Sequence, residues 1–452
     1  MTLRAQFASG PIADCLDDDA LLRSMVAFER ALARAQGAAG AIPAHAAERI
    51  DSLAAGARFD TAELVTQARR AGTLAIAFVK QLTAQVRNAD VEASGYVHWG
   101  ATSQDVLDTA MVLCARDALR LVLERVDRLG EAVARLADEH RATPMVARTL
   151  LQPATPIPFG FKAATWLDAL ARSRLGLQRA AAGSLVLQFG GASGVLSPLR
   201  ERGVDVAQRL ARELGLPEPA MPWHSIRDRV ARLGAELGIA CGVVAKIGLD
   251  VALLMQPELG EAFEPSGKGR GGSSALPHKQ NPLGAMYARE AGLRAPGLVA
   301  NLVLGVAGEH ERGLGQWQTQ FWTLGELFAA LGSALDAMVE VVEGLRIERD
   351  AMARNLEALH GFVFAEALGT RLAVVLGKSE AHARVEALCR KALAEGSTLQ
   401  RALEADDEMA ALVPAQEREQ LFDAAAQFGA ADTMIDRALA AWRDEEDDRC
   451  RS

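Results

Sequence analysis

Five long segments with apolar residues at helical spacing constrain the fold more than any other feature of the sequence. In residues 104–141, about 38 positions without a proline, apolar side chains recur every three or four residues. Four further segments have the same pattern: residues 156–182, 225–259, 282–311 and 323–345. The mean helix of a globular protein has only about 11–12 residues. The sequence therefore predicts a bundle of unusually long helices.

Several of these helices are apolar around much of their circumference. Residues 241–255, CGVVAKIGLDVALLM, contain one Lys and one Asp among apolar residues. Such a helix must be covered on several sides, which predicts contacts with other subunits. A large core within a single chain is the alternative interpretation.

Shorter helical patterns precede and follow the long segments, and they predict an all-α protein of three domains. Residues 1–95 form the N-terminal domain, residues 96–345 the central domain of long helices, and residues 346–452 the C-terminal domain.

Glycines and acidic residues mark helix ends in the outer domains. In the first, an amphipathic helix starts with acidic residues at 17–19 and ends before Gly40, and a helical pattern over residues 62–85 is interrupted near Gly72. In the third, residues 361–376 and 380–395 predict a helix pair joined at Gly377.

Composition and charge exclude several classes of protein. The chain has 49 Lys and Arg against 58 Asp and Glu, a formal charge of −9, which does not indicate a nucleic-acid or membrane-surface partner. The 5 cysteines are dispersed without a CxxC pair, which predicts reduced thiols in the cytoplasm. We expect neither a signal peptide nor a membrane span, since no run of about 18 uncharged apolar residues occurs. Because metal-ligand spacings and nucleotide-binding fingerprints are absent from the sequence, we expect no metal and no cofactor.

The densest group of reactive side chains lies in residues 266–282, SGKGRGGSSALPHKQNP. Glycine clusters are unfavourable inside helices and strands, so this stretch is predicted to be a loop between two long helices. Its hydroxyl, amide and ammonium groups suit an active-site loop, and the helix start after it favours anion binding. A plain surface linker is the alternative.

Two further polar clusters precede long helices. In residues 98–105, HWGATSQD, Thr102 or Ser103 can cap the helix that starts at Gln104, and the same groups can bind a carboxylate. Capping alone would explain one hydroxyl and would leave His98 unexplained. In residues 148–156, two prolines fix a turn that carries Thr149 and Gln152; on its own this segment could be a simple helix connection.

Additional polar residues open the predicted helix at 225. His224 and Arg227 could reach an anionic ligand. Arg227 could equally be solvated or paired with Asp228 at the helix start.

Taken together, the three clusters resemble the fumarase/aspartase superfamily over essentially the whole chain. Residues 272–282 resemble its signature loop, GSSxMPxKxN, with Leu276 in place of Met, and His278 stands at a variable position. Residues 100–105 and 148–156 resemble its first and second regions. The resemblance implies a mostly helical three-domain protomer. It also implies a homotetramer with a central bundle of twenty helices, in which three subunits contribute to each active site.

Within the superfamily, the chain most resembles cycloisomerases that close a lactone on a carboxylated muconate during protocatechuate breakdown. The resemblance is carried by residues 97–110, 222–229, 311–322 and 361–377. Leu150 and Met286 stand where many other lyases have a His and a Glu that act on the leaving group. An amine or hydroxide needs a proton as it leaves, whereas a carboxylate is already a stable anion. The two positions thus favour lactonisation over adenylosuccinate, argininosuccinate or fumarase chemistry.

The resemblance also implies roles for individual residues. Ser273 would transfer the proton to or from carbon, and Lys279 would stabilise its oxyanion. The tricarboxylate substrate would be bound by His98, Thr102, Ser103, Thr149, Gln152, Arg227, Ser274 and Asn281. A β-eliminating lyase like adenylosuccinate lyase is the alternative enzyme, in which His98 or His224 would replace the missing acid. A non-catalytic structural protein is disfavoured, since it would not need Ser273, Lys279 and Asn281.

Overall fold

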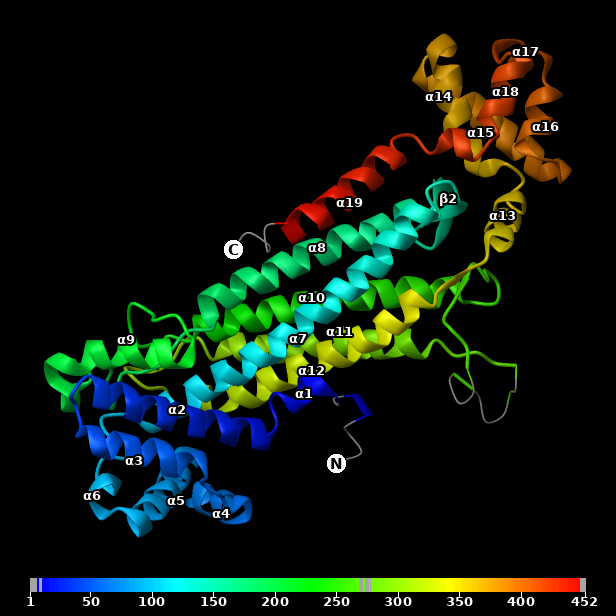
Figure 1. The fold of residues 1–452 in the computed structure, drawn as a ribbon. Helices are drawn as coiled ribbons and strands as arrows, with labels where there is room; N and C mark the ends of the chain where they lie inside the picture. Colours follow the sequence, from blue (N-terminus) through cyan, green and yellow to red (C-terminus); the bar gives the residue numbers. More distant parts are fainter. Residues whose placement is uncertain (1–5, 8–9, 268–270, 273–275, 277, 448–452) are drawn as a thin grey trace. The chain divides into compact units, whose positions relative to one another are not determined.

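The structure is a computed structural model that describes residues 6–7, 10–267, 271–272, 276 and 278–447 (Figure 1). The described residues are mostly helical, with two short two-stranded sheets, as the all-α prediction requires. The chain divides into two compact units. The first comprises residues 1–125, 174–242 and 290–333, and the second residues 126–173, 243–289 and 334–452. The predicted division into three domains stays a prediction.

Five long helices contribute residues to both units, and they correspond to the five predicted segments. They are α7 (Ser103–Glu139), α8 (Phe159–Ser184), α10 (Asp228–Leu254), α11 (Leu283–Leu304) and α12 (Gln316–Glu343). The ends differ most between α11 and α12. There the helix predicted to reach residue 311 stops at Leu304, because Gly305 and Gly308 interrupt it. Gly313 and Gly315 follow in the same connection.

The remaining helices of the first unit are short. They are α1 (Pro11–Asp14), α2 (Asp18–Ala38), α3 (Ala44–Ala55), α4 (Thr61–Ala71), α5 (Leu74–Ala89), α6 (Val91–Ser94), η2 (Ser197–Arg202) and α9 (Gly203–Leu214). Asp17 caps α2 by accepting a hydrogen bond from the backbone N–H of Ala20 at 2.7 Å. Gly72 adopts a left-handed conformation, with φ of 74°, and ends α4. Both boundaries agree with the sequence prediction.

The second predicted region is a hairpin and not a simple turn. Strand β1 (Pro144–Thr149) pairs antiparallel with β2 (Gln152–Pro158), and Thr149 lies opposite Gln152. The helix expected from residue 156 therefore begins later, at Phe159. Prolines are tolerated in β2 because each strand of a two-stranded sheet is an edge strand.

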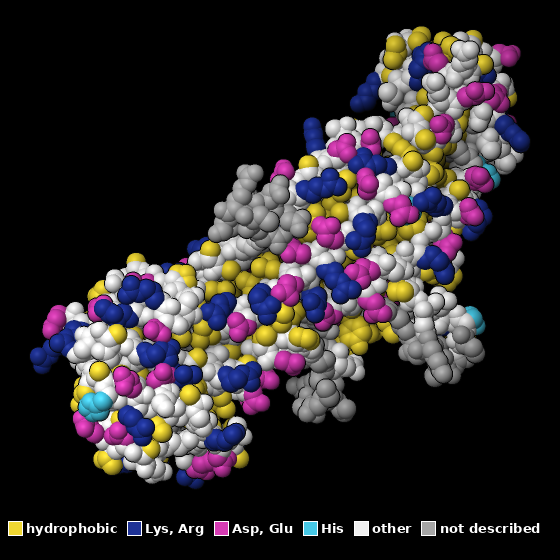
Figure 2. All heavy atoms as spheres, viewed as in Figure 1, with side chains coloured by type: hydrophobic (Ala, Val, Ile, Leu, Met, Phe, Trp, Pro, Cys, Tyr) yellow, Lys and Arg dark blue, Asp and Glu magenta, His cyan; other side chains and the backbone are white. Residues whose placement is uncertain are grey.

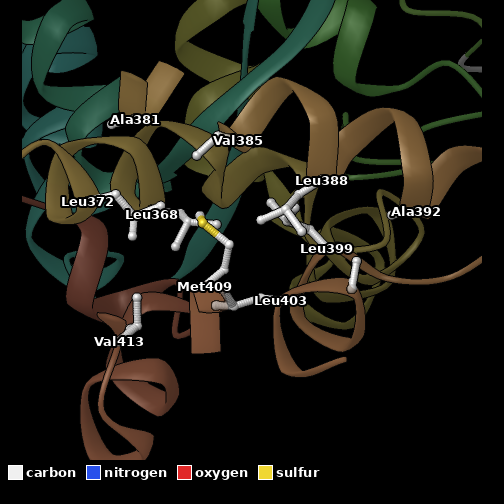
Figure 3. Packing of buried hydrophobic residues seen from close by; sticks show 11 residues of the cluster. Leu368, Leu372, Ala381, Val385, Leu388, Ala392, Leu399, Leu403, Met409 and Val413 are labelled. Carbon is white, nitrogen blue, oxygen red and sulfur yellow. The ribbon is translucent and has the colours of Figure 1, made fainter. Parts of the chain in front are cut away.

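The C-terminal part of the second unit has a small core of its own. Its elements are β4 (Arg346–Ile347), α13 (Arg349–Glu357), η3 (Phe362–Phe364), α14 (Ala365–Leu376), α15 (Lys378–Glu395), α16 (Leu399–Glu404), α17 (Asp407–Leu412), α18 (Ala415–Leu421), η4 (Ala425–Gln427) and α19 (Ala431–Asp447). Strand β4 pairs antiparallel with β3 (Ala262–Phe263), which follows α10 in the chain. Leu368 and Leu372 of α14 pack with Leu388 of α15 and Met409 of α17 (Figure 3). The expected helix pair joined at Gly377 is present.

Helix α10 is unusually apolar, as predicted. Among the described residues, no other single helix is long and apolar enough to cross a membrane. The mean hydropathy of α10 is 2.0 over its most apolar window of 18 residues. Half of that window is buried within the structure, as in the core helix of a globular protein. In the first unit, Ile239 of α10 and Leu293 and Leu304 of α11 remain exposed. Figure 2 shows apolar side chains between charged ones on one face of the molecule. Cover of the exposed apolar residues by other subunits stays a prediction.

One close helix contact in the second unit yields a stability prediction. Gly130 of α7 lies against Trp442 of α19, and a Cβ at residue 130 would lie 2.1 Å from the indole ring. Gly130→Ala should therefore destabilise the protein by about 1–3 kcal/mol. Gly183→Ala is the matched control, because nothing lies within 4 Å of that exposed helical position. It should stabilise the chain by up to about 1 kcal/mol. Urea unfolding measures both, and equal changes in the two variants would contradict the packing argument.

Candidate active site

The first predicted region is organised by the buried carboxylate of Asp105. It accepts hydrogen bonds from the backbone N–H groups of Thr102 at 3.0 Å, Gly190 at 3.0 Å and Gly191 at 2.9 Å. Nε2 of His224 lies 2.7 Å from the same carboxylate. Since a carboxylate only accepts, Nε2 must carry the proton. Asp105 is 0 % exposed, and these donors compensate the burial of its charge.

Arg312 lies beside the start of α7 and was missed by the sequence analysis. Its Nη1 donates to the hydroxyl of Thr102 at 2.9 Å, and its Nη2 donates to the carbonyls of Gly191 at 3.3 Å and Ala192 at 3.0 Å. Because these partners are neutral, the half-buried guanidinium retains its charge for an anion. The sequence analysis predicted a helix up to residue 311, but the four glycines between residues 305 and 315 could have indicated a loop around Arg312, before α12.

His98 lies near the same helix start and against a buried carboxylate. Its Nδ1 lies 2.5 Å from a carboxylate oxygen of Glu29, on α2. Burial by itself lowers the pKa of His98, but the charge and hydrogen bond of Glu29, together with the charge of Asp105, outweigh burial and raise it. The predicted residues His98, Thr102 and Ser103 therefore lie near one helix start, where the charged neighbours are Arg312, Glu29 and Asp105.

Arg227 does not project from the helix start as a free cation. It is 1 % exposed and donates two hydrogen bonds to Asp108, at 2.6 and 2.9 Å, and one to Gln320 at 2.7 Å. Its guanidinium also stacks over the ring of Trp223. These contacts support the alternative of an internal ion pair, formed with Asp108 and not with the neighbouring Asp228. Substrate binding by Arg227 stays a prediction.

In the second unit, Thr149 and Gln152 flank the exposed tip of the hairpin. The tip residues Leu150 and Leu151 have φ of 52° and 64°, a left-handed conformation that leucine rarely adopts. They are 97 % and 76 % exposed. A turn with two positive φ values normally contains Asn-Gly. The strain, about 1–3 kcal/mol for each residue, and the exposure are typical of a functional turn.

The base of this hairpin is held by a buried ion pair. Arg148 donates to both oxygens of Glu261, at 2.8 and 2.7 Å, and Glu261 is 0 % exposed. Asn355 of α13 donates to the same carboxylate at 2.7 Å. A bidentate pair of this kind fixes direction as well as distance, so β1 approaches the tip in one orientation.

The third predicted region is only partly described. Ser273 and Ser274 lie outside the described residues. Lys279 is exposed. Asn281 donates through its backbone N–H at 2.9 Å and its side-chain amide at 3.0 Å to the carbonyl of Gly271. The amide of Asn281 thus joins the two ends of the loop in this structure.

The helix start that follows the loop is occupied by a carboxylate of the protein itself. Glu264, which is buried, accepts hydrogen bonds from the backbone N–H groups of Gly284 at 3.0 Å and Ala285 at 2.8 Å. The expectation that this helix start binds the substrate anion is therefore wrong for these two groups. Glu264 precedes the loop, so its contacts also hold the loop's two ends together.

The predicted regions are divided between the units of the protomer. His98, Thr102, Ser103, Arg227 and the newly found Arg312 belong to the first unit, and Thr149, Gln152, Lys279 and Asn281 to the second. In the part of the chain that the structure describes, no group of three His, Cys, Asp or Glu residues could hold a metal ion.

These features define a helical lyase, and comparison with known proteins supports that class. Residues 9–297 match the lyase family, and residues 361–438 match the family of the adenylosuccinate lyase C-terminus. The chain belongs to the lyase family, within the fumarase/aspartase superfamily that its motifs indicate.

Individual relatives and solved structures are similar to the chain over nearly its whole length. The chain is 45 % identical over 437 residues, 97 % of each protein, to a 3-carboxy-cis,cis-muconate cycloisomerase of Bradyrhizobium diazoefficiens. It is 43 % identical to the protein of that name from Pseudomonas aeruginosa, over 96 % of this chain and 95 % of the relative. The crystal structure of a 3-carboxy-cis,cis-muconate lactonizing enzyme from Pseudomonas putida superposes with a TM-score of 0.91 at 39 % identity, covering 97 % of this chain and 98 % of the other.

The contacts of Glu264 predict a local effect on the loop. Glu264→Gln keeps one oxygen acceptor but places an amide N–H₂ against the backbone donors of α11. Loss of about 1 kcal/mol of capping should speed trypsin cleavage between residues 264 and 283 about fivefold, since cleavage follows local opening. Mass spectrometry measures the cleavage sites and rates.

Asp406→Ala is the matched control for this experiment. Asp406 caps α17, in the same unit, by accepting a hydrogen bond from the backbone N–H of Met409 at 3.0 Å. Loss of this cap should lower stability by about 1 kcal/mol without faster cleavage in the loop. Equal cleavage rates in wild type and Glu264→Gln would contradict the proposed anchoring.

The raised pKa of His98 predicts pH-dependent anion binding. Protonated His98 attracts an anion, so affinity should be highest below the raised pKa and should fall as the pH rises through it. Calorimetry with tricarballylate, an inert tricarboxylate, between about pH 6 and 9 tests this prediction. His98→Gln should bind more weakly at low pH and lose most of this pH dependence. The same pH profile in both proteins would exclude His98 as the titrating group.

Proposed function

We propose that the chain is a cycloisomerase that converts 3-carboxy-cis,cis-muconate to 4-carboxymuconolactone. The near full-length similarity to enzymes of that name carries the proposal. One position of the candidate site supports the same proposal, namely the position at which many other lyases have a catalytic His. That position holds Leu150, which is 97 % exposed at the hairpin tip and can neither donate nor accept a proton.

Charge complementarity supports a substrate with three carboxylates. Arg312 carries a positive charge beside Thr102, protonated His98 would add a second, and Lys279 would add a third from the signature loop. Gln152 and Thr149 offer neutral hydrogen bonds from the hairpin. In a homotetramer, three subunits would contribute these regions to one site. The exposed apolar residues of α10 and α11 support such an assembly.

The proposed reaction moves one proton and closes one ring. An oxygen of the substrate's internal carboxylate attacks an alkene carbon, and the π electrons shift to the neighbouring carbon and into its carboxylate as an enolate-like anion. Ser273 then donates its hydroxyl proton to that carbon and regains a proton from water. Lys279 stabilises the serine oxyanion. No acid for the leaving group is needed, since the reverse reaction expels a carboxylate, and this accounts for Leu150 and Met286.

A second candidate is a β-eliminating lyase like adenylosuccinate lyase. The match of residues 361–438 to the adenylosuccinate lyase C-terminus favours it. Leu150 and Met286 disfavour it, because an amine leaving group needs an acid. For the cycloisomerase, we further propose a place in the protocatechuate branch of the β-ketoadipate pathway, in the cytoplasm.

Ultraviolet absorbance tests the function and the role of Ser273 together. The wild-type protein should remove the muconate chromophore and leave the absorbance of adenylosuccinate unchanged. Ser273→Ala should lower kcat by about 10²–10⁴-fold, because it loses the proton donor, and Ser397→Ala should retain wild-type turnover as a control. Size-exclusion chromatography checks that both variants keep the native assembly.

Two results would contradict the proposal. Turnover of adenylosuccinate and not of carboxymuconate would favour the lyase, and inertness towards both would favour a non-catalytic protein. Wild-type turnover by folded Ser273→Ala would exclude Ser273 as the proton donor and leave the cycloisomerase function intact.

A further inference from the structure

We propose that Asp105 is a positioning residue that holds Thr102 and Arg312 in the arrangement in which they bind a substrate carboxylate. The inference rests on the proposed function, because it assumes an anionic substrate at the start of α7. Asp105 is 0 % exposed and therefore acts through its neighbours and not by touching substrate.

A closed ring of hydrogen bonds links Asp105 to both residues. One oxygen of Asp105, Oδ2, accepts from the backbone N–H of Thr102 at 3.0 Å and of Gly191 at 2.9 Å. The carbonyl of Gly191 accepts from Arg312 at 3.3 Å, and Arg312 donates to the hydroxyl of Thr102 at 2.9 Å. Because the ring is closed, a shift of Asp105 moves the hydroxyl and the guanidinium together.

The other oxygen of Asp105 anchors the ring to the rest of the first unit. It accepts from the backbone N–H of Gly190 at 3.0 Å and lies 2.7 Å from Nε2 of His224, which is 4 % exposed. Gly191 has φ of 71°, and a Cβ there would lie 2.9 Å from the carbonyl of Gly100. The turn at 190–191 therefore fits tightly against the residues that precede α7, and it offers little room for compensating movement.

The carboxylate also acts through its charge. Asp105 on α7 and Glu29 on α2 are the two charged groups that raise the pKa of His98, against the lowering effect of burial. A neutral residue at 105 removes one of these contributions. Asp105 therefore favours the protonated form of His98 and also holds Arg312 in position.

The substitution Asp105→Asn separates this role from general stability. Asparagine keeps the size of the side chain but replaces one acceptor with an N–H₂ group that opposes the backbone donors. Tricarballylate binding by calorimetry should weaken at least about tenfold, equivalent to about 1.4 kcal/mol, and the pH midpoint of binding should move to lower pH. KM for carboxymuconate should rise in parallel.

Asp250→Asn is the matched control. Asp250 is another buried carboxylate on a long helix, and it accepts a hydrogen bond from Nε1 of Trp166 at 2.8 Å. Its loss should lower thermal stability while the affinity and pH midpoint of tricarballylate binding stay at their wild-type values. A second variant, His224→Gln, alters one contact of Asp105 but keeps its charge, so it should weaken tricarballylate binding by a smaller amount and leave the pH midpoint unchanged.

The outcomes separate this inference from the proposed function. Wild-type affinity and pH midpoint in folded Asp105→Asn would overturn the inference, and if Asp105→Asn does not fold, unchanged affinity in His224→Gln would overturn it. Tricarballylate binding by a wild-type protein that does not turn over carboxymuconate would contradict the proposed function alone. Failure of the wild type to bind tricarballylate would overturn the inference whatever reaction is catalysed.

Discussion

Buried carboxylates that accept backbone N–H groups hold the functional segments of this protein against its long helices. Asp105 binds the N–H groups of Thr102, Gly190 and Gly191, and Glu264 binds those of Gly284 and Ala285. A charge removed from water is stable only where donors surround it, so each carboxylate fixes the positions of its donors. Both are placed where a loop meets the first turn of a long helix, the point at which a catalytic segment needs a defined direction.

In this arrangement the helices and the loops have different roles. The long helices supply the buried apolar surface, whereas the polar segments between them carry the reactive groups. The hairpin shows the same division, because the Arg148–Glu261 pair holds its base while the strained leucines at its tip remain exposed. Strain of this kind persists only if the surrounding structure enforces it.

In the proposed function, the chemistry depends on charges and not on a strong acid. We propose that Arg312, whose partners are neutral, and His98, whose pKa is raised, attract a substrate carboxylate, and that no acid serves the leaving group, since Leu150 cannot supply a proton. Such an assembly would suit a reaction whose leaving group is itself a carboxylate. The helix start at Gly284, in contrast, is unavailable to substrate because Glu264 occupies it.

Periodicity in the sequence determined the long helices and the break at Gly72, because a stripe of apolar residues over 20 or more positions can be buried only as a helix. The motifs likewise indicated the lyase family and most of the candidate residues. Only the tertiary structure showed that residues 144–158 form a hairpin, that Arg227 is internally paired, and that Arg312 reaches Thr102. The two arginine contacts join residues 119 and 210 positions apart, and local sequence carries no signal for a partner so distant in the chain. The hairpin is local, but its turn has Leu150 and Leu151 in place of the usual Asn-Gly, so the turn signal was missing.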